Sequence, residues 1–429
     1  MTKHTASFLL TTLVAMCTMG IAQPGQPMNL EDLIREAVAN NPQLRAARHQ
    51  TAAAQTKVDQ ATAWEAPQVG VVMYQTPIQS FPNPFKNGME TDYYIQQMFP
   101  FPGKLSAMGD AAHNGASMTE QNYHTLEQQI IRAVKDAYDE LYLVQRKIEV
   151  NAANQDLMRK FVAIASKQYE VGKASQADVL RGQTEFSSLL AGMVTLRQEL
   201  GVARSMMNTL LYRPVDAPLG DVPEVERAMP VWTFEQLRPL ALENRPDLRR
   251  MQYSLAMNTA DLSAAKREYW PDLMVQVMYK DMAMTRNDFW STMIGVSIPI
   301  APWASGKVTS KADEEELNVK KAEEDLAAMS SMVLFDVQDA LAKVRSNEEI
   351  VTLDKTTVIP QAEQTMISTQ AAYATGKTDF LALLDAYKTL LSTRLDYYTA
   401  VTAFMKSQSW LEQAVGLSIP EIAQRIAQK

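Results

Sequence analysis

The sequence predicts a mainly helical protein with a small β part, built from two copies of one structural unit. The first observation is internal repetition: residues 40–45 (NNPQLR) return as 244–249 (NRPDLR), and 169–173 (YEVGK) return as 373–377 (YATGK). The members of both pairs lie about 204 residues apart, which indicates a duplicated unit. Two further observations are long helical stretches and short alternating runs at matching places in both copies.

These repeats give the expected domain organisation: a signal peptide at 1–22, a first repeat at 23–220 and a second at 221–429. Lys3, a short apolar run and the small-residue site at 20–22 predict the signal peptide. Its cleavage would remove Cys17, the only cysteine, so disulfide and thiolate chemistry are not expected. Acylation at Cys17 is the alternative.

Composition excludes some classes of partner. The chain is 46% hydrophobic and 21% charged, as folded proteins are, and its net charge of −8 offers no basic face to nucleic acid. After the signal peptide, the sequence shows no apolar stretch long enough for a membrane-spanning helix. Insertion into a membrane would therefore require a β-barrel.

Along the first repeat, a helical pattern covers 30–63 and is broken at Asn41-Pro42, where the proline can begin a second helix. An alternating run then starts at Pro67, and a second run covers 93–99 after a loop rich in Pro, Asn and Gly. We interpret these two runs as paired strands.

In the second repeat the strand pattern is clearer. Residues 290–298 alternate an apolar face with a small or polar face, and 273–280 form the partner run. The length suits a transmembrane strand, although a soluble hairpin with one buried face explains the alternation equally well. Exposed strand edges favour the first interpretation, because several copies pooling four strands each would remove every edge.

Long helices follow both hairpins. Residues 103–213 contain no proline and 307–375 contain no glycine, and we expect one helix from about 105 to 168, roughly 95 Å long. Apolar residues recur at heptad spacing in both copies: Ile130, Val134, Ala137, Leu141, Val144 and Ile148, then Leu334, Val337, Leu341 and Val344. A coiled coil would explain the heptads but not the hairpins inserted at equivalent places.

Each long helix ends at a Gly-Lys pair, Gly172-Lys173 and Gly376-Lys377, which predicts a left-handed helix cap before a return helix. The duplication, the Asn-Pro-x-Leu and Tyr-x-x-Gly motifs, the Pro-led strands, the Ile-Pro-Ile strand end at 298–300 and the Leu-Leu-Asp-Ala stretch at 383–386 occur together. With this ordered set, the chain resembles the TolC family of outer-membrane efflux channels over nearly its whole mature length.

The resemblance implies a homotrimer in the outer membrane, with a twelve-stranded β-barrel and a trimeric α-barrel of long-helix hairpins that crosses the periplasm. Its implied partners are outer-membrane lipid, a periplasmic adaptor (membrane fusion) protein and an inner-membrane efflux pump of the RND type. The channel would be a passive conduit for small molecules or ions, with no catalytic residue and no cofactor. The alternative is a periplasmic coiled-coil adaptor or scaffold without a membrane barrel.

The resemblance also implies a gate just past the Tyr-x-x-Gly turns, where acidic rings narrow the channel. Asp385 falls on one acidic position and Asp178 on another, whereas Ala382 and Arg181 replace the remaining two. We expect Asp178, Arg181, Lys377 and Asp385 to set the gate. The same turns are expected to dock the adaptor, through Tyr169, Gly172, Lys173, Tyr373, Gly376 and Lys377.

Metal chemistry has little support from the usual ligands, because the four histidines are scattered and form no ligand-spaced pair. The 25 methionines leave one question open. Several lie around the second hairpin: Met274, Met278, Met282, Met284 and Met293. Thioethers suit Cu(I), so copper or silver export is one interpretation. The other is that methionine fills irregular apolar gaps, faces lipid or lines the barrel.

Overall fold

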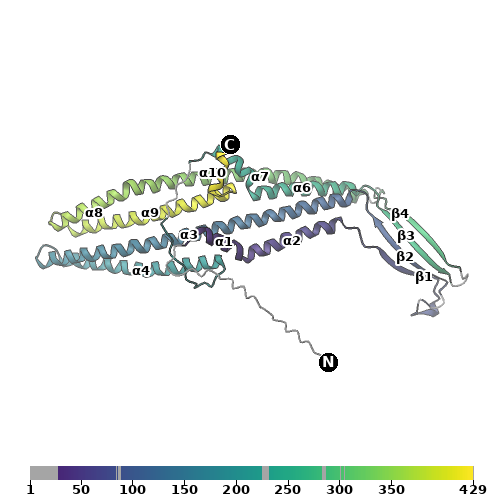
Figure 1. Ribbon diagram of the computed structural model, residues 1–429, viewed down its shortest axis with the longest axis horizontal. Coiled ribbons are helices and arrows are strands. Elements are labelled where there is room, and N and C mark those ends of the chain that lie inside the picture. The colour runs from purple at the N-terminus through teal and green to yellow at the C-terminus, as the bar shows by residue number, and fades with distance from the viewer. Residues whose placement is uncertain are drawn as a thin grey trace, which may run out of the picture.

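The computed structural model describes residues 28–83, 85, 88–224, 231–282, 287–299, 301–303 and 305–428. The chain is elongated, with a four-stranded sheet at one end and the tips of two helical hairpins at the other (Figure 1). The predicted signal peptide, Cys17, Met284 and Ile300 lie outside the described residues. The mainly helical class with a small β part is confirmed.

In the first repeat, α1 (Leu30–Asn40) and α2 (Pro42–Thr62) are separated at Asn41. The Asn41 side-chain oxygen accepts hydrogen bonds from the backbone N–H groups of Gln43 (2.7 Å) and Leu44 (3.3 Å), and Pro42 occupies the first helical position. This cap satisfies otherwise unpaired donors at a helix start. The predicted break is confirmed.

The first hairpin consists of α3 (Lys104–Glu170), an unbroken helix of 67 residues, and α4 (Gln176–Leu211). Of the heptad positions on α3, Val134 and Leu141 are fully buried, whereas Ile148 is half-buried. The short helix α1 covers this heptad stripe together with α4, in one core cluster. The heptads therefore pack against neighbouring helices of the same chain.

The second repeat follows the same order: α5 (Phe234–Asn244), α6 (Pro246–Arg267), α7 (Ser305–Leu353), a π-helical turn (Asp354–Val358), α8 (Ile359–Ala374), α9 (Phe380–Val415) and α10 (Ile419–Ala427). Here α5 packs on α7, as α1 packs on α3. None of the helices in the described ranges is both long and apolar enough to cross a membrane.

The sheet contains β1 (Gln68–Tyr74), β2 (Glu90–Phe99), β3 (Leu273–Met282) and β4 (Phe289–Val296), all antiparallel and in sequence order. A single-turn helix, η1 (Ile78–Ser80), lies in the loop between β1 and β2. The two hairpins join through β2 and β3, where Tyr93 pairs with Tyr279. One continuous sheet therefore has two edges, β1 and β4.

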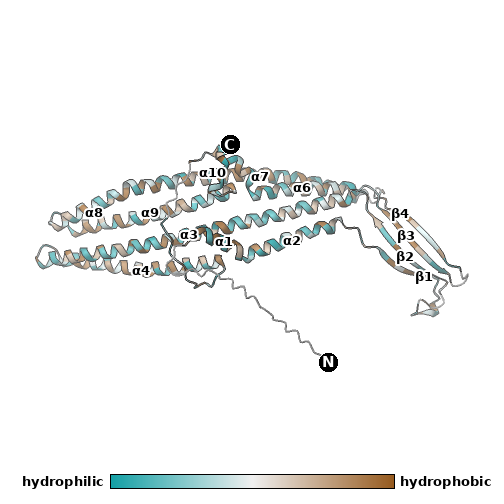
Figure 2. Ribbon diagram, viewed as in Figure 1, coloured by the Kyte–Doolittle hydropathy of each residue, from teal (hydrophilic) through white to brown (hydrophobic). Residues whose placement is uncertain are grey.

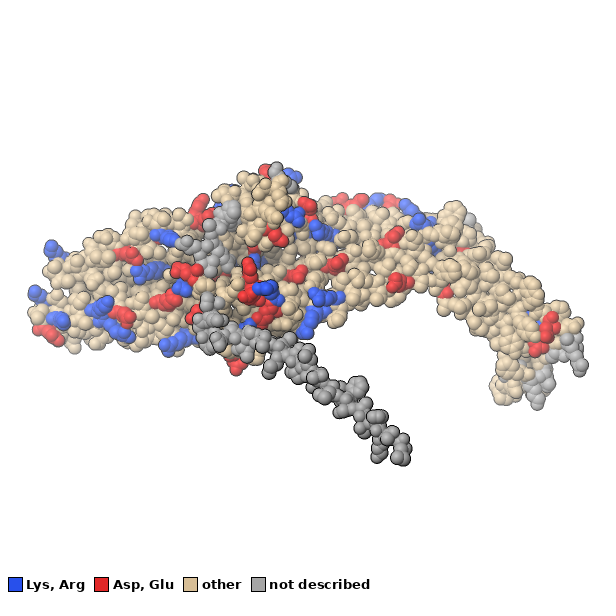
Figure 3. Space-filling model, in the orientation of Figure 1, with Lys and Arg blue, Asp and Glu red and all other residues tan. Residues whose placement is uncertain are grey.

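Hydropathy varies along the strands (Figure 2), and because successive side chains point to opposite faces, the pairing register gives the sheet two faces of different chemistry. Val69, Trp290 and Ile294 lie on the apolar face and are 76%, 77% and 70% exposed. On the other face, Asp92 is completely buried and Gln276 is 8% exposed. The visible surface of the sheet carries few charged residues, whereas the helices carry many (Figure 3). On the central strands β2 and β3 the polar face is thus sheltered and the apolar face open, the reverse of a soluble hairpin.

The pairing register places the strand methionines. Met98 pairs directly with Met274, and Met278, four residues later in β3, lies on the same face. Met293 pairs with Gln276, so it shares this polar face, and Met282 lies on it opposite Glu90. Met73 pairs with Thr91 and lies on the apolar face. Most of the described strand methionines therefore avoid the face where an apolar side chain would be expected.

Candidate functional site

Both hairpin tips close with the same backbone turn. Gly172 and Gly376 adopt the left-handed conformation, with φ of 72° and 74°. The N–H of Lys173 donates to the carbonyl of Gln168 (2.8 Å), and the N–H of Lys377 donates to that of Ala372 (2.9 Å). These bonds form the Schellman motif that ends many helices. The predicted left-handed caps are confirmed.

The return helices begin with side-chain caps. The N–H of Asp178 donates to Ser175 Oγ (3.2 Å), and the N–H of Ser175 donates to Asp178 Oδ2 (3.0 Å), which forms a capping box at the start of α4. At α9, Asp379 Oδ1 accepts from the N–H of Ala382 (2.8 Å). Asp178 therefore has a structural task at the position where the sequence predicts a gate residue.

The four predicted gate residues all lie at this end of the molecule. Arg181, Lys377 and Asp385 are exposed and Asp178 is half-buried. Among the described residues of the single chain, no ion pair joins any two of these four side chains. The charges of Arg181, Lys377 and Asp385 are therefore open to a second copy or a partner, whereas the Asp178 carboxylate is engaged in the cap of α4.

The two tips contact each other unequally. Tyr169 is 48% exposed, whereas Tyr373 is 6% exposed and packs edge-on against Phe380 with ring centroids 5.5 Å apart. Burial, and then the nearby Asp178 carboxylate, raises the pKa of Tyr373, so its phenol stays protonated. The prediction that Tyr373 docks an adaptor conflicts with this burial, which places the ring inside the tip.

An apolar cluster, which we call the tip cluster, joins the two hairpins: Met158, Phe161, Ala165, Leu189, Tyr373, Phe380, Leu383, Leu384 and Tyr387. At its centre α9 fills the groove between α3 and α4, which we call the filled groove. A side chain on Gly182 would place its Cβ 3.2 Å from the Phe380 ring, so glycine allows this ring to enter. Phe161 and Tyr387 meet edge to face at 6.0 Å.

Polar contacts flank the tip cluster. Lys388 Nζ lies 2.9 Å from Glu185 Oε2, and the Gln168 amide donates to the carbonyl of Ala374 at 3.1 Å. Burial, and then Glu185, raises the pKa of Tyr387. The α3–α4 tip and the α8–α9 tip are thus bound to each other by aromatic packing, one ion pair and a hydrogen bond.

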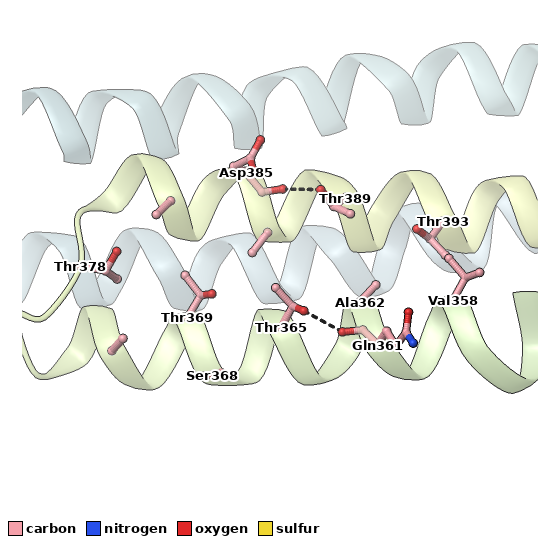
Figure 4. A pocket seen from close by; sticks show the side chains of 13 residues that line it. Val358, Gln361, Ala362, Thr365, Ser368, Thr369, Thr378, Asp385, Thr389 and Thr393 are labelled. Atoms are coloured by element: carbon pink, nitrogen blue, oxygen red, sulfur yellow. Dashed lines mark hydrogen bonds between the residues drawn. The ribbon is translucent and has the colours of Figure 1, made fainter.

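A second groove runs between α8 and α9 and is open to solvent in the single chain (Figure 4). It encloses about 540 Å³, and its lining is small and largely hydroxyl-bearing. We call it the open groove; its lining includes Ala362, Thr365, Thr369, Asp385, Ala386, Thr389 and Thr393. Thr365 and Thr389 donate to the carbonyls of Gln361 (2.8 Å) and Asp385 (3.0 Å) one turn earlier. The sequence analysis did not predict this groove. Aligning the two tips would have indicated it, because Thr365 and Thr389 stand where the first hairpin has Phe161 and Glu185.

The chain matches the family model of outer membrane efflux proteins over residues 33–211 and 237–417. It belongs to this family. The cobalt-zinc-cadmium resistance protein CzcC of Cupriavidus metallidurans is 22% identical over 395 residues, which cover 91% of this chain and 90% of CzcC. TolC of Escherichia coli is also 22% identical, over 95% of this chain and 86% of TolC. The crystal structure of VceC from Vibrio cholerae has a TM-score of 0.77 and 17% identity, covering 91% and 96% of the two chains.

Family membership fixes the class of function. This outer membrane efflux protein is an outer-membrane channel of a tripartite efflux system, and its family is not one of enzymes. Such a channel implies an adaptor and an inner-membrane pump as partners. The coiled-coil scaffold alternative is not favoured.

Proposed function

We propose that three copies of the chain form a passive export duct, with a barrel of strands in the outer membrane and the helices in the periplasm. The observation that carries this proposal is the reversed sheet, whose apolar face is exposed and whose polar face is sheltered on the central strands β2 and β3. Lipid would cover the first face and water in the duct would wet the second. The edges β1 and β4 would pair between copies, so no edge remains unpaired.

Aromatic residues at both ends of the sheet support this placement. Near the helices, Phe101 stacks on Trp270 at 5.1 Å, and Trp64 meets Phe99 edge-on at 5.2 Å. Toward the other end, Tyr93 and Tyr279 lie side by side on the apolar face. Phe99 and Tyr93 are six residues apart on β2, which spans about 20 Å of strand. Two aromatic girdles flanking an apolar band are typical of outer-membrane barrels.

Membrane fractionation followed by native mass determination in detergent tests the duct. We expect a trimer in the outer-membrane fraction that needs detergent for extraction. A water-soluble monomer would contradict the proposal, because the exposed sheet face would then have no lipid to cover it.

We propose the same domain organisation as the sequence predicts, with repeats at 23–220 and 221–429 behind a signal peptide at 1–22. The matching element order of the two halves supports the division. The mass of the mature protein and its N-terminal residue would test both the cleavage site and acylation of Cys17.

We propose that the adaptor docks on the hairpin tips, and that the pump behind it is of the RND type. Tyr169, Gly172, Lys173, Gly376 and Lys377 are exposed there, and open space surrounds both glycines. The two lysines suit an acidic partner surface. Reversal of both charges, Lys173→Glu with Lys377→Glu, should reduce co-purification of the adaptor while the native mass stays unchanged. Co-purification of a proton-driven or an ATP-driven pump would identify the pump class.

We propose that Asp178, Arg181, Lys377 and Asp385 determine how the duct closes. Because Asp178 also caps α4, its charge and its cap must be tested separately. Asp178→Asn keeps a side-chain acceptor, whereas Asp178→Ala removes the hydrogen bond to the Ser175 N–H at a cost of about 0.5–1.5 kcal/mol. In planar bilayers, Asp178→Asn with Asp385→Asn should raise conductance and change ion selectivity. Unchanged conductance and selectivity would contradict the gate.

A soft metal cation is a second candidate for the cargo. Met98, Met274, Met278 and Met293 share the polar face of the sheet, where an apolar side chain has no lipid to meet. Thioethers bind Cu(I) and Ag(I), and the relative CzcC is named for resistance to cobalt, zinc and cadmium. Met274→Leu with Met278→Leu should lower silver tolerance conferred by the pump, whereas Met73→Leu on the apolar face should not. Equal silver tolerance in the wild type, the double variant and Met73→Leu would contradict this cargo.

A further inference from the structure

The charged residues on the polar face of the sheet gather at one place. Glu90 and Asp92 of β2 and Lys280 of β3 are the only charged residues on that face of the four strands that the structure describes. Asp92 pairs directly with Lys280, and Glu90 lies two residues before Asp92 on the same face. β2 begins at Glu90 and runs toward α3, so the three residues lie at the end of the sheet away from the helices (Figure 1). We call them the outer triad.

One lysine serves both carboxylates of the outer triad. Lys280 Nζ lies 2.7 Å from Glu90 Oε1 and 3.1 Å from Asp92 Oδ2. It also lies 5.8 Å from the centre of the Tyr74 ring, within the range of a cation–π contact. Two carboxylates against one ammonium group leave a surplus of one negative charge in each copy of the chain.

The Asp92 carboxylate is only partly compensated. Asp92 is completely buried in the single chain. Its Oδ2 binds Lys280, but its Oδ1 is buried without a hydrogen-bond partner among the described residues. Burying a carboxylate oxygen without a donor costs free energy. The sheet therefore keeps this negative charge at the expense of its own stability.

A second lysine–aspartate pair, at the helical end of the sheet, is balanced. Lys104 Nζ lies 3.0 Å from Asp272 Oδ2, and the N–H of Phe101 donates to Asp272 Oδ1 at 2.8 Å. Here one cation meets one carboxylate, and both carboxylate oxygens are bonded. Joining two segments of the chain needs no more than this. The second carboxylate of the outer triad and its unpartnered oxygen are thus not explained by holding β2 and β3 together.

We propose that the outer triad is a charge filter at the outer mouth of the duct, which favours cations over anions. The inference rests on the proposed trimeric duct, in which the polar face lines the water-filled interior. Three copies related by symmetry would bring their triads to one depth, with three surplus negative charges around the wall. Rings of acidic side chains select cations in channels, because they raise the local concentration of counter-ions.

The outer triad and the tips act at different places. The triad lies at the sheet end of the molecule, whereas Asp178 and Asp385 lie at the hairpin tips, at the opposite end (Figure 1). Exposed charges separated by more than about 10 Å are largely screened at 0.1 M salt. The filter therefore adds a second selection step, at the exit of the duct, to any selection at its periplasmic entrance.

A graded charge series tests the filter. Glu90→Gln would cancel the surplus charge of the trimer and Glu90→Lys would reverse it, and both leave the Asp92–Lys280 pair in place. Lys280→Gln would double the surplus. In planar bilayers with a KCl gradient, the reversal potential should lie closest to the K⁺ equilibrium potential in Lys280→Gln. It should move away from that potential through the wild type and Glu90→Gln to Glu90→Lys. The differences should shrink in about 1 M salt, where the Debye length is about 3 Å.

Two control variants separate charge on this face from other changes. Asp281→Asn removes one negative charge beside Lys280, on the exposed apolar face, and should leave the reversal potential unchanged. Lys280→Arg keeps the charge of the triad and should behave as the wild type. Lys280→Gln leaves Asp92 without its cation and can impair assembly. In that case Glu, Gln and Lys at position 90 still form a graded series.

The outcomes separate the filter from the duct and from the gate. A protein that forms no conducting channel would overturn the duct. A conducting trimer with the same reversal potential at all charges of position 90 would overturn the filter and leave the duct standing. The shift caused by Glu90→Lys should persist in the Asp178→Asn, Asp385→Asn background. A shift that vanishes there would overturn a filter separate from the tips.

Discussion

The two long hairpins descend from one duplicated unit but differ in continuity. In the first, α3 runs without interruption for 67 residues. In the second, α7 gives way to the π-helical turn Asp354–Val358 before α8 begins. The N–H of Ile359 donates to the carbonyl of Asp354, five residues earlier. Pro360 follows at once, and a proline inside a helix lacks the N–H and crowds the preceding turn. The residue of α3 that is equivalent to Pro360 is Asp156.

The difference in helix continuity coincides with the difference between the two grooves. π-helical turns inside helices are rare and often lie at functional sites. The π-helical turn lies next to the open groove, because Val358 belongs to the groove lining. The continuous hairpin thus provides the filled groove, and the interrupted hairpin carries the open one. The duplication kept the turns and caps and changed the helix interior and the contact chemistry.

The largest expected effect would come from emptying the filled groove. Phe380 is 1% exposed, so Phe380→Ala should lower the free energy of local opening at the tips by about 3–5 kcal/mol, because it leaves a cavity. Hydrogen exchange of the tip amides measures this opening. The matched variant Gln176→Ala at the equivalent exposed position should change the exchange of the isolated chain little. Equal changes in hydrogen exchange for Phe380→Ala and Gln176→Ala would contradict the difference between the filled groove and the open groove.

A proline exchange between the hairpins should have the next largest effect. Asp156→Pro would introduce into α3 the interruption that α7–α8 carries, at a cost of about 3 kcal/mol. Hydrogen exchange around 150–160 should rise. Asp156 also pairs with Arg159 at 2.6 Å, so Asp156→Ala serves as the control for that exposed ion pair, worth about 0–1 kcal/mol.

The reverse exchange, Pro360→Ala, should protect the amides at 354–360, because position 360 can then donate to the carbonyl of residue 356. Slower exchange there with slower channel opening would identify the π-helical turn as a hinge. Unaltered exchange would mean that Pro360 does not cause the turn.

The smallest expected effect concerns pH. Burial, and then the Asp396 carboxylate on α9, raises the pKa of Asp354 in the π-helical turn. The folded state thus favours the protonated acid, so this contribution is fully present below the unfolded pKa. It is lost as the pH rises through the higher folded value. The protection factor of the amides at 354–360, which removes the intrinsic rise of amide exchange with pH, should fall across that acidic range in the wild type and stay constant in Asp354→Asn. A wild-type protection factor without pH dependence would contradict the assignment.

Much of the fold could be predicted from local sequence. The cap at Asn41-Pro42, the left-handed glycines and the paired strands depend on residues close in the chain, and all occur where the sequence places them. Alternation alone does not say which face of the sheet is sheltered. Only the argument from exposed strand edges favoured the membrane interpretation, in which the apolar face is open. The heptad pattern also needed correction in the second repeat, where Val333 is fully buried and Leu334 is half-buried.

The gate and docking roles of the tip residues stay predictions, because they depend on other copies and on a partner. Asp178, Arg181, Lys377 and Asp385 lie just after the left-handed turns at Gly172 and Gly376. The capping role of Asp178 and the burial of Tyr373 depend on how two hairpins cross, which a single-helix pattern does not contain. Comparing Phe161 with Thr365, and Tyr387 with Gln183, was within reach of the sequence. The meaning of these differences required knowing that Phe161 and Tyr387 are in contact.

Duplication inside one chain has a geometric consequence for the ring. Six identical hairpins would be joined by six equal contacts and would widen as a circle. In the proposed trimer, three chains with two unlike hairpins would place a ring-packed filled groove and a threonine-lined open groove alternately around the duct. Each ring-packed pair of hairpins would move as one body, so the aperture would have three corners when the pairs part.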